Sequence, residues 1–80
     1  MKLLVRNLSR DTTEAELKAL FTEIGQVTAC TLVMDKATGK SKGFGFVEMP
    51  KHIEAKTAIQ ALNAKKIAGS VIRVKEAEDD

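Results

Sequence analysis

Four short stretches of the chain are rich in apolar and β-branched residues, and two longer stretches carry apolar residues every three or four positions. The first pattern is typical of strands and the second of amphipathic helices. Strands are therefore predicted at residues 2–8, 27–34, 42–49 and 71–75. Between them, one helix is predicted to begin at Thr13 and to end before Gly25, and a second spans residues 52–63.

Each predicted helix carries a single apolar stripe. Thr13 and Glu16 have the spacing of a capping box, in which the hydroxyl accepts from a helical N–H and the glutamate reaches back to the cap N–H. Gly25 is suited to end the first helix, because glycine tolerates the left-handed backbone that often follows one. The stripes, at positions i, i+3, i+4 and i+7, consist of Leu17, Leu20, Phe21 and Ile24 in the first helix and of Ala55, Ala58, Ile59 and Leu62 in the second.

The order strand-helix-strand-strand-helix-strand predicts an α+β fold of the ferredoxin-like class. Helices with one apolar stripe each should cover one face of a four-stranded antiparallel sheet and leave the other face open to solvent. A chain of 80 residues holds one domain, which we place at residues 1–77. Residues 78–80 are predicted to be a short acidic tail.

The third predicted strand decides what the open face contains. Lys42 and Glu48 share a strand face with two phenylalanines, Phe44 and Phe46, and burying the two charged residues would be costly. We therefore expect both rings to point outward, with Gly43 and Gly45 facing the helices and leaving room for their close approach. By the same alternation, the outward positions of the other strands carry Lys2, Leu4, Arg6, Ala29, Thr31, Val33, Val71, Arg73 and Lys75.

The positions of the charged residues indicate the binding partner better than the net charge does. Thirteen basic and 11 acidic residues give a net charge of +2, which is too mild to indicate a partner. Two exposed rings surrounded by cations, in contrast, suit single-stranded nucleic acid, because bases stack on rings and cations hold phosphates. A duplex hides its base faces and is a poor ligand for a flat sheet.

Other features of the composition exclude several classes of protein. No apolar run approaches the roughly 18 residues that span a membrane. The single cysteine, Cys30, excludes an internal disulfide and a cysteine-pair metal site, and its inward position predicts an inert core thiol. We therefore expect a cytoplasmic protein (or a nuclear one in a eukaryote) without membrane attachment, metal or other cofactor.

Residues 42–49 read KGFGFVEM and resemble the ribonucleoprotein octamer of the RNA recognition motif family, departing only at Met49. Residues 3–8, LLVRNL, resemble the companion hexamer of the same family, and residues 72–77 resemble its last strand. The resemblance covers nearly the whole chain, and its size is similar to that of small stand-alone bacterial members. It implies a ferredoxin-like fold that binds single-stranded RNA on the sheet.

The resemblance also implies roles for individual residues. Phe46 would stack on a base, Phe44 would pack on a ribose or between two sugars, and Lys42 would pair with a phosphate. Leu4 stands where the family usually has a second stacking ring, so it offers apolar contact but no stacking. Ala64 stands where the family often has a glycine, and this departure affects the geometry of the turn after the second helix and not the function. The full set of candidate RNA-binding residues is Phe44, Phe46, Leu4, Lys42, Arg6, Lys2, Arg73, Lys75, Thr31 and Lys40.

Some alternatives stay open from the sequence. Lys36 and Lys40, on the loop between the middle strands, either clamp the RNA backbone or only keep the loop soluble. The ligand is single-stranded RNA, with single-stranded DNA as the alternative, and we expect a monomer without a small-molecule substrate.

The competing function is a protein-interaction or self-association module that uses the apolar patch of the same face, made of Leu4, Val33, Phe44 and Phe46. We expect no enzyme activity. Arg6 and Asn7 after the first strand are the only feature shared with a small acyl phosphate hydrolase, and the phosphate-binding loop of such an enzyme is absent from the sequence.

Overall fold

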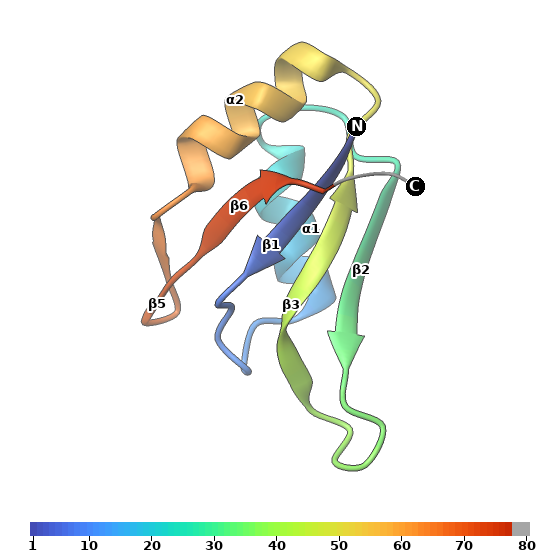
Figure 1. Ribbon diagram of the computed structural model, residues 1–80, viewed down its shortest axis with the longest axis vertical. Coiled ribbons are helices and arrows are strands. Elements are labelled where there is room, and N and C mark those ends of the chain that lie inside the picture. The colour runs from blue at the N-terminus through green and yellow to red at the C-terminus, as the bar shows by residue number, and fades with distance from the viewer. Residues whose placement is uncertain (78–80) are drawn as a thin grey trace.

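One four-stranded antiparallel sheet forms the framework of the computed structural model, which describes residues 1–77 (Figure 1). Its strands are β1 (Lys2–Arg6), β2 (Ala29–Met34), β3 (Ser41–Glu48) and β6 (Arg73–Glu76), in the spatial order β2-β3-β1-β6. The first strand of the chain pairs with β3 on one side and with the last strand on the other. The predicted α+β architecture is confirmed; the predicted acidic tail at 78–80 lies outside the described residues.

Two helices, α1 (Glu14–Thr22) and α2 (His52–Leu62), cover one face of the sheet, the face turned away from the viewer in Figure 1. The predicted capping box of α1 is present: Glu16 N–H donates to Thr13 Oγ1 and Thr13 N–H donates to Glu16 Oε1, both at 3.1 Å. Helix α2 begins after Lys51 without a side-chain cap. Within residues 1–77, no helix is both long and apolar enough to cross a membrane.

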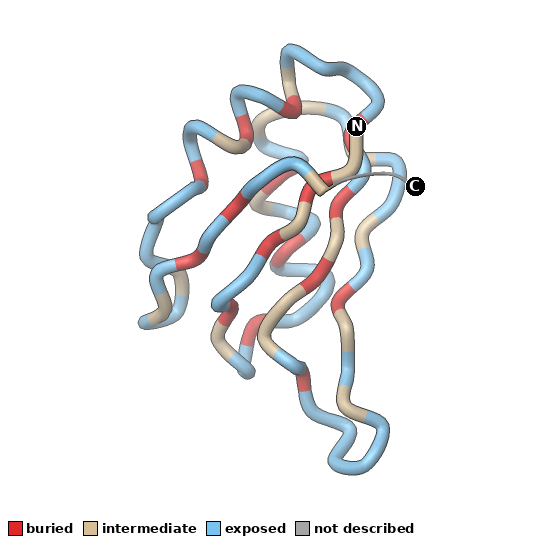
Figure 2. Tube along the Cα trace, in the orientation of Figure 1, coloured by how far each residue is buried: buried red, intermediate tan, exposed pale blue. Residues whose placement is uncertain are grey.

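The core lies between the helices and the inner face of the sheet. Along β1 and β3, buried positions alternate with more exposed ones, as the colours of Figure 2 show. This alternation confirms the predicted inward and outward faces of the two central strands. The buried apolar residues are Leu3, Val5, Leu8, Leu17, Phe21, Leu32, Val47, Met49, Ala55, Ala58, Leu62, Ile72 and Val74.

The strands at the start and the end of the chain are shorter than predicted. β1 ends at Arg6, because Asn7 adopts a left-handed backbone (φ 60°) that leaves the strand direction. Near the end of the chain, the prediction missed a small hairpin, β4 (Lys66–Ile67) paired with β5 (Ser70–Val71). The last strand therefore begins at Arg73, and Val71 lies on this hairpin instead of on the main sheet.

Gly25 has a different role from the predicted one. Helix α1 ends at Thr22, with Glu23 as its C-cap, and Gly25 does not have a left-handed φ. A side chain at Gly25 would instead collide with Glu54, whose carboxylate accepts a hydrogen bond of 2.9 Å from the backbone N–H of Gln26. The glycine is thus required for the close approach of the two segments.

The two glycines of β3 differ in function. At Gly45, a Cβ would lie 2.5 Å from the carbonyl oxygen of Thr31 in β2 and 3.3 Å from the Leu17 side chain of α1, so both the neighbouring strand and the helix approach this position closely. Gly43 instead has a φ of +85°, and its carbonyl oxygen accepts from Leu8 N–H at 2.8 Å. Only glycine adopts this backbone without strain, and the pairing of β3 with β2 shifts register at this point.

β2 forms one edge of the sheet and is partly covered by a side chain of α1. The backbone N–H of Leu32 points away from β3 and donates to Glu14 Oε2 at 3.1 Å. A backbone donor that would otherwise lie free at the sheet edge is thereby satisfied.

Candidate nucleic-acid interface

The outward rings of β3 stand at the centre of the open sheet face. Phe44 and Phe46 are half-buried, whereas Val47 and Met49 on the opposite side of the strand are fully buried. The ring centroids are 6.3 Å apart and the ring planes are at 88°, so one ring presents its edge to the other. This arrangement is a favourable one for an aromatic pair.

The register of the sheet builds a row of side chains around Phe46. Thr31 of β2 and Leu4 of β1 are its direct cross-strand neighbours, and Lys75 lies opposite Leu4 on β6. Directly opposed side chains on one face of a sheet lie about 5 Å apart at Cβ. The ring is therefore flanked by a hydroxyl on one side and an apolar side chain with a cation beyond it on the other.

A second row, one step along the strands, holds opposite charges. Lys2 lies directly opposite Glu48, and Ala29 faces Glu48 from the other side. The ammonium nitrogen of Lys2 lies 4.6 Å from the centre of the Phe46 ring, which is the geometry of a cation–π contact. Together with Thr31, these residues line a hollow of about 250 Å³. The sequence predicted that Glu48 points outward but gave it no binding role.

A larger cationic hollow lies at the other edge of the sheet. Arg6 is paired with Arg73 across β1 and β6. The hollow has a volume of about 430 Å³ and is lined by Arg6, Asn7, Asn63, Arg73, Val74 and Lys75. No role was predicted for Asn63, which follows α2 and whose Oδ1 accepts from Val74 N–H at 3.1 Å. Nothing in the sequence indicates that the end of α2 meets β6.

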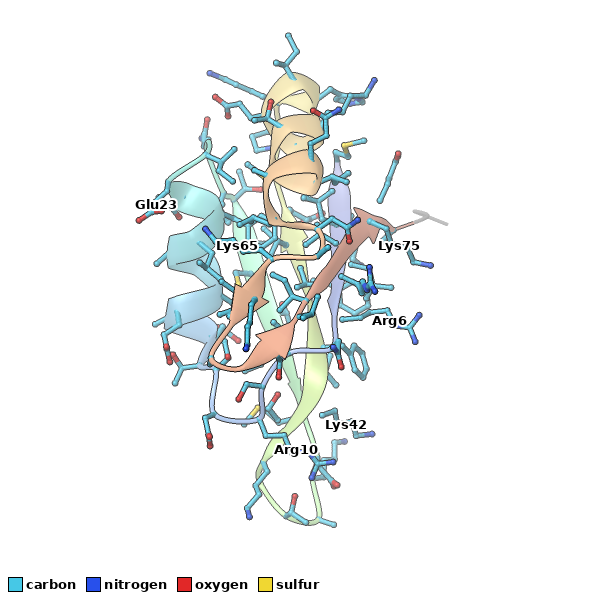
Figure 3. All side chains as sticks on the ribbon, turned by 90° about the vertical axis from the view of Figure 1, so that its left-hand side faces the viewer. Arg6, Arg10, Glu23, Lys42, Lys65 and Lys75 are labelled. Atoms are coloured by element: carbon cyan, nitrogen blue, oxygen red, sulfur yellow. The ribbon has the colours of Figure 1, made fainter. Side chains whose placement is uncertain are left out.

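A third hollow joins the loop between β2 and β3 to the aromatic pair. Its volume is about 360 Å³, and it brings Lys40, Lys42 and Arg10 together with Phe44 and the carboxylate of Asp35. Arg10 belongs to the loop between β1 and α1, for which the sequence predicted no binding role. Figure 3 shows Arg6, Lys42 and Lys75 on the side of the sheet away from α1, with Arg10 near Lys42. The structure thus gathers the predicted cations around the two rings and adds Arg10.

Cys30 lies apart from this face. It points inward as predicted but is only half-buried near the sheet edge, where its Sγ lies 3.8 Å from the carbonyl oxygen of Glu14. Burial raises the pKa of the Cys30 thiol, and the negative charge of Glu14 raises it further, while Lys18 acts in the opposite direction. The thiolate, which is the reactive form, is therefore disfavoured.

Comparisons with known proteins relate the chain to a large group. A family model described as the RNA recognition motif matches residues 3–73. RbpB, a candidate RNA-binding protein of Nostoc sp., is 42% identical over 78 residues, which cover 98% of this chain and 76% of that protein. Among solved structures, the crystal structure of RNA-binding protein PG1 superposes with a TM-score of 0.95 at 38% identity, covering 100% of this chain and 96% of that one. A structure described as a Sxl-lethal protein/RNA complex has a TM-score of 0.92 at 33% identity, covering 99% of this chain and 47% of that one.

Proposed function

Because the chain belongs to the RNA recognition motif family, whose model matches residues 3–73, we propose that it binds single-stranded RNA on the outer face of its sheet. The observation that carries this proposal is the pair Phe44 and Phe46, held outward on a central strand and surrounded by cations. Stacking of a base on an aromatic ring is worth about 1–3 kcal/mol. The cations add an attraction for phosphates that depends on salt.

Phe46 is the proposed stacking platform. In the free protein the Lys2 ammonium occupies the space above its ring. An exposed cation–π contact is worth about 0.5–1 kcal/mol, which is less than the stacking of a base, so a base displaces the ammonium. Once displaced, Lys2 is free to contact a phosphate or the edge of the same base.

The second nucleotide has a weaker platform. The Phe44 ring is perpendicular to that of Phe46, so the two cannot stack on two parallel bases; Phe44 is instead proposed to pack on a ribose. Leu4, beside Phe46 in the next strand, contributes apolar contact without a ring face. We therefore propose that one base dominates the stacking energy and that the affinity for short RNA is modest.

The cations lie at the Phe44 end of the aromatic pair and at the β6 edge of the sheet. Lys40 and Lys42 line the hollow next to Phe44, and Arg6, Arg73 and Lys75 line the hollow at the β6 edge. A strand of RNA that crosses both rings would thus have phosphates near cations on either side. Thr31, next to Phe46, offers a hydroxyl that can donate or accept.

We further propose that the protein acts by binding and not by catalysis, and that it is a cytoplasmic monomer. Self-association through the sheet face is opposed by its own cations, which would repel those of a second copy. The same face would also accept single-stranded DNA, since stacking and phosphate contacts are common to both. RNA is distinguished by its 2′-hydroxyl groups.

The test of this proposal is the variant Phe46→Ala, measured with a labelled random-sequence RNA pool by fluorescence anisotropy. The dissociation constant should rise by the equivalent of about 1–3 kcal/mol while the circular dichroism spectrum stays unchanged. Ile53→Ala is the matched control, because Ile53 is 82% exposed on α2, and it should bind like the wild type. An unchanged affinity in a folded Phe46→Ala variant would contradict the proposal.

A further inference from the structure

We infer that the position above Phe46 selects guanine over the other three bases; this inference rests on the proposed RNA binding. The residues that make the selection are Glu48 and Lys2, which face each other across β3 and β1 beside the ring. They line the same hollow of about 250 Å³ as Phe46, so the volume above the ring opens directly onto them.

The spacing along the strand places both groups at the edge of a stacked base. Glu48 lies two residues beyond Phe46 on the same face of β3, about 6.6 Å away at the usual strand rise. Its carboxylate therefore meets the edge of a base centred on the ring, not its face. Lys2 reaches the space above the ring, since its ammonium nitrogen lies 4.6 Å from the ring centre in the free protein. When a base stacks on Phe46 and displaces this ammonium, the ammonium of Lys2 stays beside the edge of the base.

The chemistry of the two groups is complementary to one base. An ionised carboxylate only accepts hydrogen bonds, and an ammonium only donates them. Guanine presents two adjacent donors, N1–H and N2–H, followed by the acceptor O6. The two oxygens of Glu48 can accept from the two donors while Lys2 donates to O6. This contact is bidentate and involves charged groups on the protein side, which makes it a strong one.

The other bases fit the same pair of residues less well. Adenine and cytosine each present one amino donor beside an accepting ring nitrogen, so the carboxylate makes one bond and faces one lone pair. Uracil presents a single N–H between two carbonyl oxygens, both of which would be turned toward the carboxylate. The opposite wall of the hollow consists of Ala29 and Thr31. The alanine has no polar side-chain group, and the threonine hydroxyl donates or accepts equally well. Neither residue therefore favours a base other than the one that Glu48 prefers.

The experiment uses four RNA pentamers that differ only in the central base within a run of uridines. Their affinities for the wild-type protein are measured by fluorescence anisotropy at one salt concentration. The guanine pentamer should bind roughly tenfold more tightly than the all-uridine pentamer, with the adenine and cytosine pentamers between them. In Glu48→Gln, which replaces one acceptor with a donor, this preference should fall to about twofold or less.

The matched control is Glu23→Gln, which makes the same change of charge on the helical side of the molecule, where Figure 3 shows Glu23 far from the sheet face. This variant should keep the wild-type preference. Equal binding of all four pentamers, together with weakened binding in Phe46→Ala, would overturn the guanine inference and leave the proposed function intact. A guanine preference that persists in Glu48→Gln would overturn the role of Glu48, and a failure of every pentamer to bind would overturn both proposals.

Discussion

The ammonium nitrogen of Lys2 lies 4.6 Å from the centre of the Phe46 ring, so a cation covers the proposed stacking platform in the free protein. The ring current of Phe46 should therefore move the resonances of the Lys2 ε-methylene protons upfield of the usual lysine position. Added RNA should shift these resonances as a base takes the place of the ammonium. Phe46→Ala should return them to the usual position without RNA. Lys2 resonances at ordinary values in the free wild-type protein would contradict the contact.

Binding should weaken steeply with salt. If three to five phosphates are neutralised, log K should fall against log salt with a slope of about −2 to −3.5. Lys75→Ala removes one cation from the hollow at the β6 edge and should make the slope shallower by about 0.7. Lys56→Ala serves as the control, because Lys56 is exposed on α2 on the other side of the molecule. Equal slopes for wild type and Lys75→Ala would show that Lys75 contacts no phosphate.

Ala64 offers a site for stabilisation. It has a left-handed backbone (φ 67°), and its N–H donates to the carbonyl oxygen of Ile72 at 2.8 Å, which holds that conformation in place. Ala64→Gly should raise the free energy of unfolding by about 0.5–1 kcal/mol, because glycine adopts this conformation without the penalty that a Cβ carries. Urea unfolding measures the change.

The same substitution at an ordinary helical position should have the opposite sign. Ala19 is exposed within α1, and Ala19→Gly should lower the free energy of unfolding by about 1 kcal/mol. A loss of stability in both variants would mean that the turn at Ala64 relaxes when the Cβ is removed.

The Cys30 thiol should react slowly. Burial, and then the charge of Glu14, raises the pKa of this thiol above its ordinary value of 9.0. The rate of alkylation by iodoacetamide should therefore rise at higher pH in the folded protein than in the same protein unfolded in urea. Because the unfolded chain ionises first, the thiol's contribution to stability is complete below the ordinary pKa and is lost as the pH rises through the raised one. Identical pH profiles with and without urea would contradict the shift.

The outward direction of Phe44 and Phe46 was predictable because a charged residue two positions away decides it. Glu48 cannot be buried without a partner, and in a strand its direction fixes that of Phe46. The hexamer and the octamer likewise predicted that Leu4 and Phe46 belong to one surface, and the strand register now makes them direct neighbours.

The hairpin before β6 could not be predicted in the same way. Its strands are two residues long and too short for an alternating pattern. Its turn uses Ala68 at a φ of 50° before Gly69, where turns of this kind usually have asparagine. The nearness of Asn63 to Arg73, and of Arg10 to Lys42, depends on how loops and helix ends pack. No local pattern in the sequence predicts this packing.

The hydrogen bond from Leu32 N–H to the Glu14 carboxylate has a consequence for the behaviour of concentrated protein. An exposed edge strand is a template on which another chain can add a strand and begin a fibril. At β2 an incoming strand would have to displace Glu14 and leave a negative charge beside its own backbone. Glu14, which begins α1, therefore also opposes polymerisation. Replacing Glu14 would first cause the protein to precipitate on storage, before any change in the fold.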